Sequence, residues 1–108
     1  MKTKHKHYRQ GDVLIMRVAN INTDKPMARE NGKVILAHGE VTGHAHAIAD
    51  EAVEQFQADA PGVTFLEIKE AVALLKHEEH GTIELPRGTY RVTRQREYSP
   101  EEIRSVAD

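Results

Sequence analysis

Four of the seven histidines in this 108-residue chain stand in two short clusters, each beside a glycine. The first cluster reads Gly-His-Ala-His at residues 43–46, and the second reads His-Glu-Glu-His-Gly at residues 77–81. Imidazole is the commonest protein ligand for transition metals, and the chain has no cysteine to supply a thiolate instead. Two pairs of imidazoles are enough to hold one divalent ion. We therefore predict a metal site whose ligands are His44, His46, His77 and His80.

The two pairs differ in how easily they can reach one ion. Side chains at positions i and i+2 of a strand point to the same face, so His44 and His46 can approach one ion together. Residues three apart on a regular strand face opposite sides, so His77 and His80 need a bulge, a turn at the following glycine, or a helix. The second cluster is also not the HExxH motif of zincin proteases, whose histidines are four apart.

The acidic residues of the second cluster offer further chemistry. Glu79 could act as a general base or as a fifth ligand, and Glu78 could orient an imidazole from outside the coordination shell. Both are also compatible with ordinary solvated carboxylates. Imidazole ligands suit Zn, Fe, Mn, Ni and Cu alike, so the sequence selects neither the ion nor a reaction. Hydrolysis, hydration, isomerisation and oxygenation all stay open.

Short apolar and β-branched runs, punctuated by glycine, proline and asparagine, predict a mainly β protein. The stretch 71–80 has helical as well as strand features, and we assign it to a strand because the chain around it is β-rich. A Pro-Arg-Gly segment at 86–88 predicts the turn of a hairpin between strands 82–85 and 89–93. Such a pattern is typical of a small barrel or sandwich, whose rim would gather the histidine-bearing strand ends. Further strands are expected at residues 12–18, 33–38, 44–49, 53–57 and 63–70.

The two ends of the chain differ from this β-rich middle. Residues 1–9 are basic and are predicted to form a flexible tail, followed by a single domain over residues 10–108. Ser99-Pro100-Glu101-Glu102 is a capping box with proline at the first helical position, which predicts a short C-terminal helix.

Composition narrows the classes of function. Apolar residues make up 39% of the chain and charged residues 30%, with a net charge of −2, so a globular protein without a strong polyanion-binding surface is expected. We interpret the arginines near the C-terminus as a charged outer face, so nucleic acid is not an expected partner. No secretory signal or transmembrane helix is predicted, and the expected location is the cytoplasm. A small-molecule ligand and pairing of sheet edges into a homo-oligomer both remain open.

Two patterns in the chain are similar to the two signature motifs of cupins. They are Gly39-x4-His44-x-His46-x4-Glu51 and Gly81-x4-Pro86-x-Gly88-x2-Arg91. The resemblance covers residues 39–95 and implies a small β-barrel with a metal held by His44, His46 and Glu51. The chain departs from the cupin pattern, because the first glycine-to-histidine spacing is one residue short. In addition, Arg91 and Gln95 stand where cupins have a histidine and an asparagine.

The chain also resembles a group of short uncharacterised bacterial and phage proteins. The shared segments are Gln-Gly-Asp-Val-Leu at 10–14, Gly-Glu-Val-Thr-Gly-His-Ala-His at 39–46, and Gly-Thr-Tyr-Arg-Val-Thr-Arg-Gln-Arg-Glu-Tyr at 88–98. No secure activity belongs to that group, so this resemblance adds no function.

Three functions follow from the sequence. The first is a metal-dependent enzyme with an open coordination position and Glu79 as the base. The second is a non-catalytic module in which the histidines close a structural metal site. The third is a metal-free interaction protein whose histidines titrate as ordinary surface groups.

Overall fold

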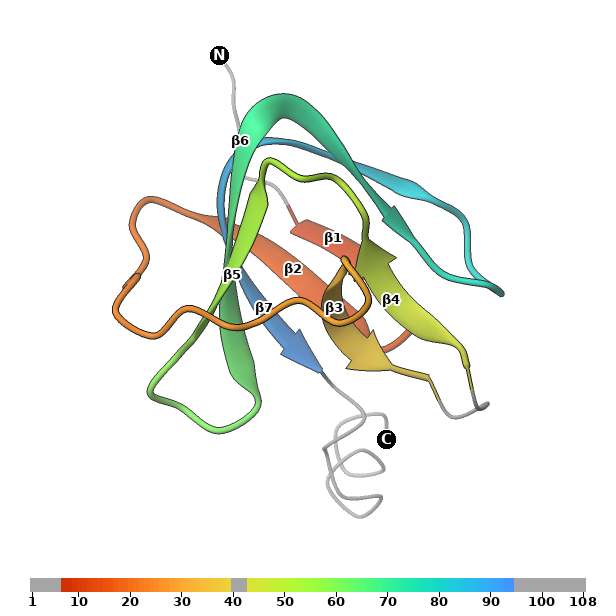
Figure 1. Cartoon of the computed structure of the whole chain (residues 1–108), viewed down its shortest axis with the longest axis horizontal. Coiled ribbons are helices and arrows are strands. Elements are labelled where there is room, and N and C mark those ends of the chain that lie inside the picture. The colour runs from red at the N-terminus through yellow and green to blue at the C-terminus, as the bar shows by residue number, and fades with distance from the viewer. Residues whose placement is uncertain (1–6, 40–42, 95–108) are drawn as a thin grey trace, which may run out of the picture.

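The computed structural model describes residues 7–39 and 43–94, which form seven strands of one antiparallel sheet (Figure 1). Along the sheet the order is β1-β2-β7-β6-β4-β3, and β5 pairs with β6 outside this path. The strands are β1 (His7–Gln10), β2 (Val13–Val18), β3 (Val34–His38), β4 (Ala45–Ile48), β5 (Val53–Gln57), β6 (Val63–Lys76) and β7 (Ile83–Arg94).

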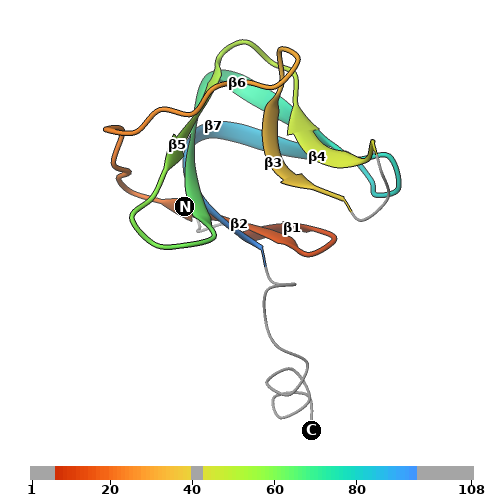
Figure 2. The ribbon, with the colours of Figure 1, turned by 60° about the horizontal axis from the view of Figure 1, so that its bottom comes forward.

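The prediction of a mainly β protein is confirmed, but of the expected small barrel or sandwich the barrel is not formed, because the sheet is open. Its two ends are β1 and β3, which do not pair with each other in the described part of the chain. The N-terminal half of β6 pairs with β5, while β4 pairs only with its C-terminal end, at Leu75 and Lys76. The sheet therefore curls without closing, and Figure 2 shows the β3–β4 end facing the β1–β2 end.

The core lies on the concave face of this curled sheet. In β2, for example, Val13 and Ile15 are fully buried while Leu14 and Met16 are partly exposed, as period-two alternation requires. In β6 the pairing with β7 shifts between Ile68 and Val72, so this long strand bends and buries side chains in both halves. The buried cluster consists of Val13, Ile15, Val34, Ala37, Ile48, Val53, Leu66, Ile68, Ala73, Leu75, Leu85, Tyr90 and Val92.

The hairpin turn predicted at residues 86–88 was also wrong. Strand β7 runs through this segment without interruption, and Pro86 is paired with Val72 of β6. Gly88 has φ of +151°, a conformation that side chains with a Cβ rarely adopt, and it lies opposite the bend of β6. The glycine therefore bends the strand and does not reverse it, and the β6–β7 reversal falls at residues 77–82 instead.

Replacement of Gly88 by alanine is expected to destabilise the fold by about 2 kcal/mol. A Cβ there would lie 2.6 Å from Nη2 of Arg17, whose guanidinium donates to the carbonyl of Arg87 and covers the Tyr90 ring. Chemical denaturation would measure the change. Gly81→Ala is the matched control, because its Cβ meets nothing within 4 Å, and it should change stability by less than about 0.5 kcal/mol. Equal effects of the two substitutions would contradict this account.

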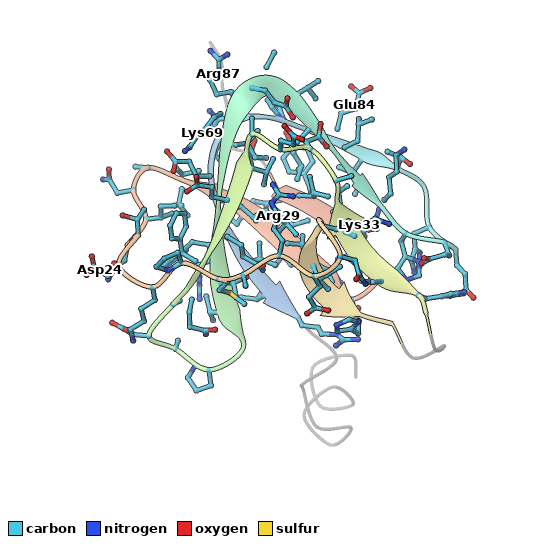
Figure 3. The ribbon with its side chains drawn as sticks, in the orientation of Figure 1. Asp24, Arg29, Lys33, Lys69, Glu84 and Arg87 are labelled. Carbon is cyan, nitrogen blue, oxygen red and sulfur yellow. The ribbon has the colours of Figure 1, made fainter. Side chains whose placement is uncertain are left out.

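The long connection between β2 and β3 is held in place by the half-buried guanidinium of Arg29. Arg29 donates hydrogen bonds to the carbonyl oxygens of Gly32, Asp50 and Val53, at 2.7–2.8 Å. In the view of Figure 3, Arg29 lies near the centre, whereas Lys69, Glu84 and Arg87 lie near the upper outline. The connection thus packs against β5, where Pro26 is bridged to Phe56.

Three further expectations concern the ends of the chain and its helical content. The sheet already begins at His7, within the segment expected to be a tail. The predicted C-terminal helix lies outside the described residues. The ambiguous stretch 71–80 is strand up to Lys76 and then a turn. Across 7–39 and 43–94, the structure has no helix that is long and apolar enough to cross a membrane.

Candidate metal centre

The two histidine clusters meet at one end of the curled sheet. His44 stands directly before β4 and His46 within it, while His77 and His80 lie in the turn between β6 and β7. All four side chains line one pocket of about 260 Å³. The pocket is completed by Asp12, Gly39, Glu79 and Arg94, which come from the β1–β2 turn, the end of β3, the β6–β7 turn and the end of β7.

His77 is the central ring of the four. Its ring centroid is 4.3 Å from that of His46, 4.7 Å from that of His80 and 5.8 Å from that of His44. Because β6 ends at Lys76, His77 and His80 lie in a turn, where side chains three residues apart need not face opposite sides. Both rings lie on one side. This is one of the arrangements that the three-residue spacing requires for the pair to act together.

One group of ligand atoms joins the two clusters through the carboxylate of Glu78, which is exposed and does not itself line the pocket. One ligand atom each from His44, His77 and Glu78 lies within 4.8 Å of the others. Two ligands on a tetrahedral ion with bonds of about 2.0–2.1 Å stand about 3.4 Å apart. The three ligand atoms therefore stand up to about 1.4 Å farther apart than in a coordinating geometry, a difference that side-chain rotations can cover.

Glu78 is tied to the first cluster by its own hydrogen bond. Its Oε1 accepts the backbone N–H of Ala45 at 3.0 Å, which brings the β6–β7 turn against the start of β4. This hydrogen bond, another from its own backbone N–H, and the nearby imidazoles of His44 and His77 lower the pKa of Glu78. The carboxylate is therefore ionised at neutral pH, and its negative charge favours a cation nearby.

Glu79 contacts two different histidines through two different groups. Its Oε2 lies 3.3 Å from Nδ1 of His44, and its backbone N–H donates to Nδ1 of His77 at 3.0 Å. The side chain is 60% exposed. A carboxylate at this distance stabilises a proton on Nδ1 of His44, which leaves Nε2 of that ring as the available ligand atom.

His46 is the buried member of the set, with 2% of its surface exposed. Its Nδ1 lies 2.8 Å from Oε1 of Gln10, and its Nε2 lies 3.7 Å from Oδ1 of Asp12. Burial lowers the pKa of His46 to about 4, helped by the charges of His77, His80 and Arg94 and opposed by that of Asp12. The ring is therefore neutral at pH 7.

Two glycines give the histidines their space. A Cβ on Gly39 would lie 3.0 Å from Cβ of His44 and 3.3 Å from Nε2 of His77. A Cβ on Gly11 would lie 2.8 Å from Nε2 of His80. Each of these glycines directly follows a strand that ends at the pocket. A glycine next to a strand end is therefore the sequence feature that indicates this end of the sheet.

Several residues around the pocket were not identified from the sequence. Asp12 accepts a hydrogen bond from Nε of Arg94 at 3.2 Å, and Nη2 of Arg94 donates to the carbonyl of His38. Gln10 is buried behind His46. Nothing in their local sequence distinguishes them, because they reach the pocket through the pairing of β1, β2 and β7, which is set by the whole sheet.

Other residues that the sequence brought forward lie away from the pocket. His38 is exposed at the end of β3, where its Nε2 lies 3.2 Å from Oε1 of Glu30. Glu51, a ligand on the cupin resemblance, is exposed before β5, and it is not among the residues that line the pocket. The structure therefore does not assemble the three ligands that this resemblance implies.

Comparison with known proteins identifies a family and nothing further. The model of a family described as "Domain of unknown function (DUF8820)" matches residues 9–95. No curated protein matches the chain, and no solved structure does so. The matched segment contains both histidine clusters, Gln10, Asp12 and Arg94.

Proposed function

The chain belongs to the DUF8820 family of domains of unknown function, and we propose from its pocket that it binds one divalent transition metal ion. The observation that carries this proposal is the approach of His44, His77 and Glu78, whose ligand atoms lie within 4.8 Å of one another. His77 and Glu78 are neighbours in the sequence, but His44 lies 33 residues before His77, so the fold is what brings His44 to the other two.

Three of the five candidate ligands have a neighbour that would orient them. The Ala45 N–H holds Glu78, the Glu79 carboxylate faces Nδ1 of His44, and Gln10 faces Nδ1 of His46. Outer hydrogen bonds of this kind select the tautomer and direction of metal-binding imidazoles. We therefore assign His44, His77 and Glu78 as the first three ligands, with His46 and His80 available to complete the shell.

Binding at His77 would require one hydrogen bond to break. Its Nδ1 accepts the Glu79 N–H, so the neutral ring carries its proton on Nε2. An ion at Nε2 needs that proton to move to Nδ1, and an ion at Nδ1 takes the place of the N–H. In either case the Glu79 amide loses its acceptor, which makes this amide a reporter of metal binding at His77.

Two histidines and one glutamate are a donor set found in catalytic zinc sites with an open fourth position. In the described part of the chain, the core of thirteen buried apolar residues includes none of the histidines. This favours an open site over one that closes a structural metal. Zn, Fe, Mn, Ni and Cu all remain candidates, and Glu79, at the rim of the pocket, stays the candidate base of an enzyme whose reaction is open.

Zinc titration of protein purified without a His-tag tests the proposal. We expect one ion per chain by calorimetry, together with a changed Glu79 amide resonance in ¹H–¹⁵N spectra. A variant with His5→Ala and His7→Ala serves as the control, because the other HxH sequence of the chain lies at its N-terminus. Zinc binding that vanishes in this variant, or a Glu79 amide that zinc leaves unchanged, would contradict the assignment.

A further inference from the structure

A single buried side chain joins the two histidine clusters. Gln10 ends β1 and is 2% exposed. Its Nε2 donates to the carbonyl oxygens of Leu75, at 3.0 Å, and Gly81, at 2.9 Å. Its Oε1 lies 2.8 Å from Nδ1 of His46. Every polar atom of this amide therefore has a partner, and the partners belong to both halves of the pocket.

We infer that Gln10 is a positioning residue that fixes His46 as an Nε2 ligand and holds the His77–His80 turn in place beside it. The part of this inference that concerns metal rests on the proposed function. The part that concerns the tautomer of His46 and the position of the turn does not, and it can be tested on the metal-free protein.

The tautomer follows from the number of donors and acceptors. Both N–H groups of the Gln10 amide are directed to carbonyl oxygens, which can only accept. The amide must therefore present its oxygen to His46, and an oxygen facing Nδ1 requires the ring to donate. In the neutral ring the proton is then on Nδ1, and Nε2 keeps its lone pair on the pocket side, 3.7 Å from Oδ1 of Asp12.

The position of the turn follows from where the two carbonyls lie. Leu75 stands two residues before His77, and Gly81 directly follows His80. The amide of Gln10 therefore bridges the two sides of the turn at its base. A side chain that bonds both sides of the turn and also the ring of His46 couples the spacing of the two clusters. Loss of this side chain should loosen that spacing even where the sheet is intact.

Gln10→Met tests the inference, because it keeps a side chain of similar length and removes all three hydrogen bonds. We expect ¹⁵N spectra of the metal-free wild type to show His46 in the Nδ1–H form. In Gln10→Met we expect a mixture of tautomers, shifted amide resonances in residues 77–81, and zinc binding weakened about 10- to 100-fold.

Gln55→Met is the matched control. Gln55 is also a buried glutamine, 5% exposed, and it donates to the carbonyl of Ile35 away from the pocket. This variant controls for the cost of losing a buried amide, and it should keep the His46 tautomer and the zinc affinity of the wild type. Gln10→Glu separates the two roles, because a carboxylate still accepts from Nδ1 of His46 but cannot donate to Leu75 and Gly81. Gln10→Glu should keep the Nδ1–H tautomer of His46 but show the shifted amide resonances of residues 77–81.

The outcomes separate this inference from the proposed function. An Nε2–H tautomer of His46 in the metal-free wild type would overturn the inference, whatever zinc does. So would a Gln10→Met protein whose turn resonances and zinc affinity match those of the wild type. A wild type that binds no zinc but shows the Nδ1–H tautomer and the Gln10-dependent turn would reject the metal proposal and support the positioning role.

Discussion

Replacing His77 with alanine is expected to weaken zinc binding by more than about 100-fold. Losing an outer hydrogen-bond partner of a ligand costs about 10- to 100-fold in affinity, and losing a ligand costs more. His77 is the appropriate target because its ring is central, with centroids of His46 and His80 within 4.7 Å and its ligand atom in one group with that of Glu78. Competition with a chromophoric zinc chelator would measure the change.

His38→Ala is the control for this prediction. His38 is the last residue of β3, directly before Gly39, but its side chain faces Glu30 and does not line the pocket. Its removal should leave zinc affinity within about twofold of the wild type. Each tenfold change in affinity corresponds to about 1.4 kcal/mol of binding free energy. A His77→Ala protein that binds zinc as tightly as His38→Ala would show that the pocket is not the metal site.

Glu78→Gln separates coordination by this carboxylate from its structural role. The amide oxygen can still accept the Ala45 N–H, so the contact between the β6–β7 turn and β4 is retained. The negative charge that would face the ion is lost. We expect zinc binding to weaken about tenfold or more, with little change in the folding of the metal-free protein measured by circular dichroism. Unchanged affinity would remove Glu78 from the ligand set.

The meeting of the histidines was predictable from the sequence in part. Imidazoles beside glycines, at the ends of short strands, favour a common rim, and all four line one pocket. The shape of the rim was not predictable. Pro86 and Gly88 favour a turn locally, yet the ladder to β6 continues through them, because pairing along the whole strand outweighs a local turn preference. The reversal therefore falls at His77, directly at the pocket.

The roles of the two glutamates could not be assigned from their positions in the sequence. Adjacent carboxylates in a turn differ only in direction, and the direction here is set by tertiary contacts. Glu78 points to Ala45 of another strand, whereas the Glu79 carboxylate points to His44 and its amide to His77. Gln10 is a similar case, because its function depends on carbonyls more than 60 residues away.

The pH dependence of the metal-free protein provides the second large effect, and it originates at His46. The pKa of this ring falls from 6.5 to about 4 on folding, chiefly because burial disfavours its charged form. Between these values the unfolded chain binds a proton that the folded chain excludes. The contribution of His46 to the free energy of unfolding is thus fully present above pH 6.5 and is lost as the pH is lowered toward 4. The expected loss between pH 7 and pH 5 is about 2 kcal/mol.

Urea denaturation at both pH values, in the presence of a chelator, would measure this loss, and His46→Gln would assign it. The variant cannot titrate at this position, so the difference in stability between pH 7 and pH 5 should shrink by about 2 kcal/mol even if the variant is less stable throughout. His38→Ala removes an exposed imidazole instead and should keep the wild-type difference. If His46→Gln keeps the full pH dependence, the pKa of His46 is not lowered by folding. That result would contradict the expectation that burial of the ring, at 2% exposure, disfavours its charged form.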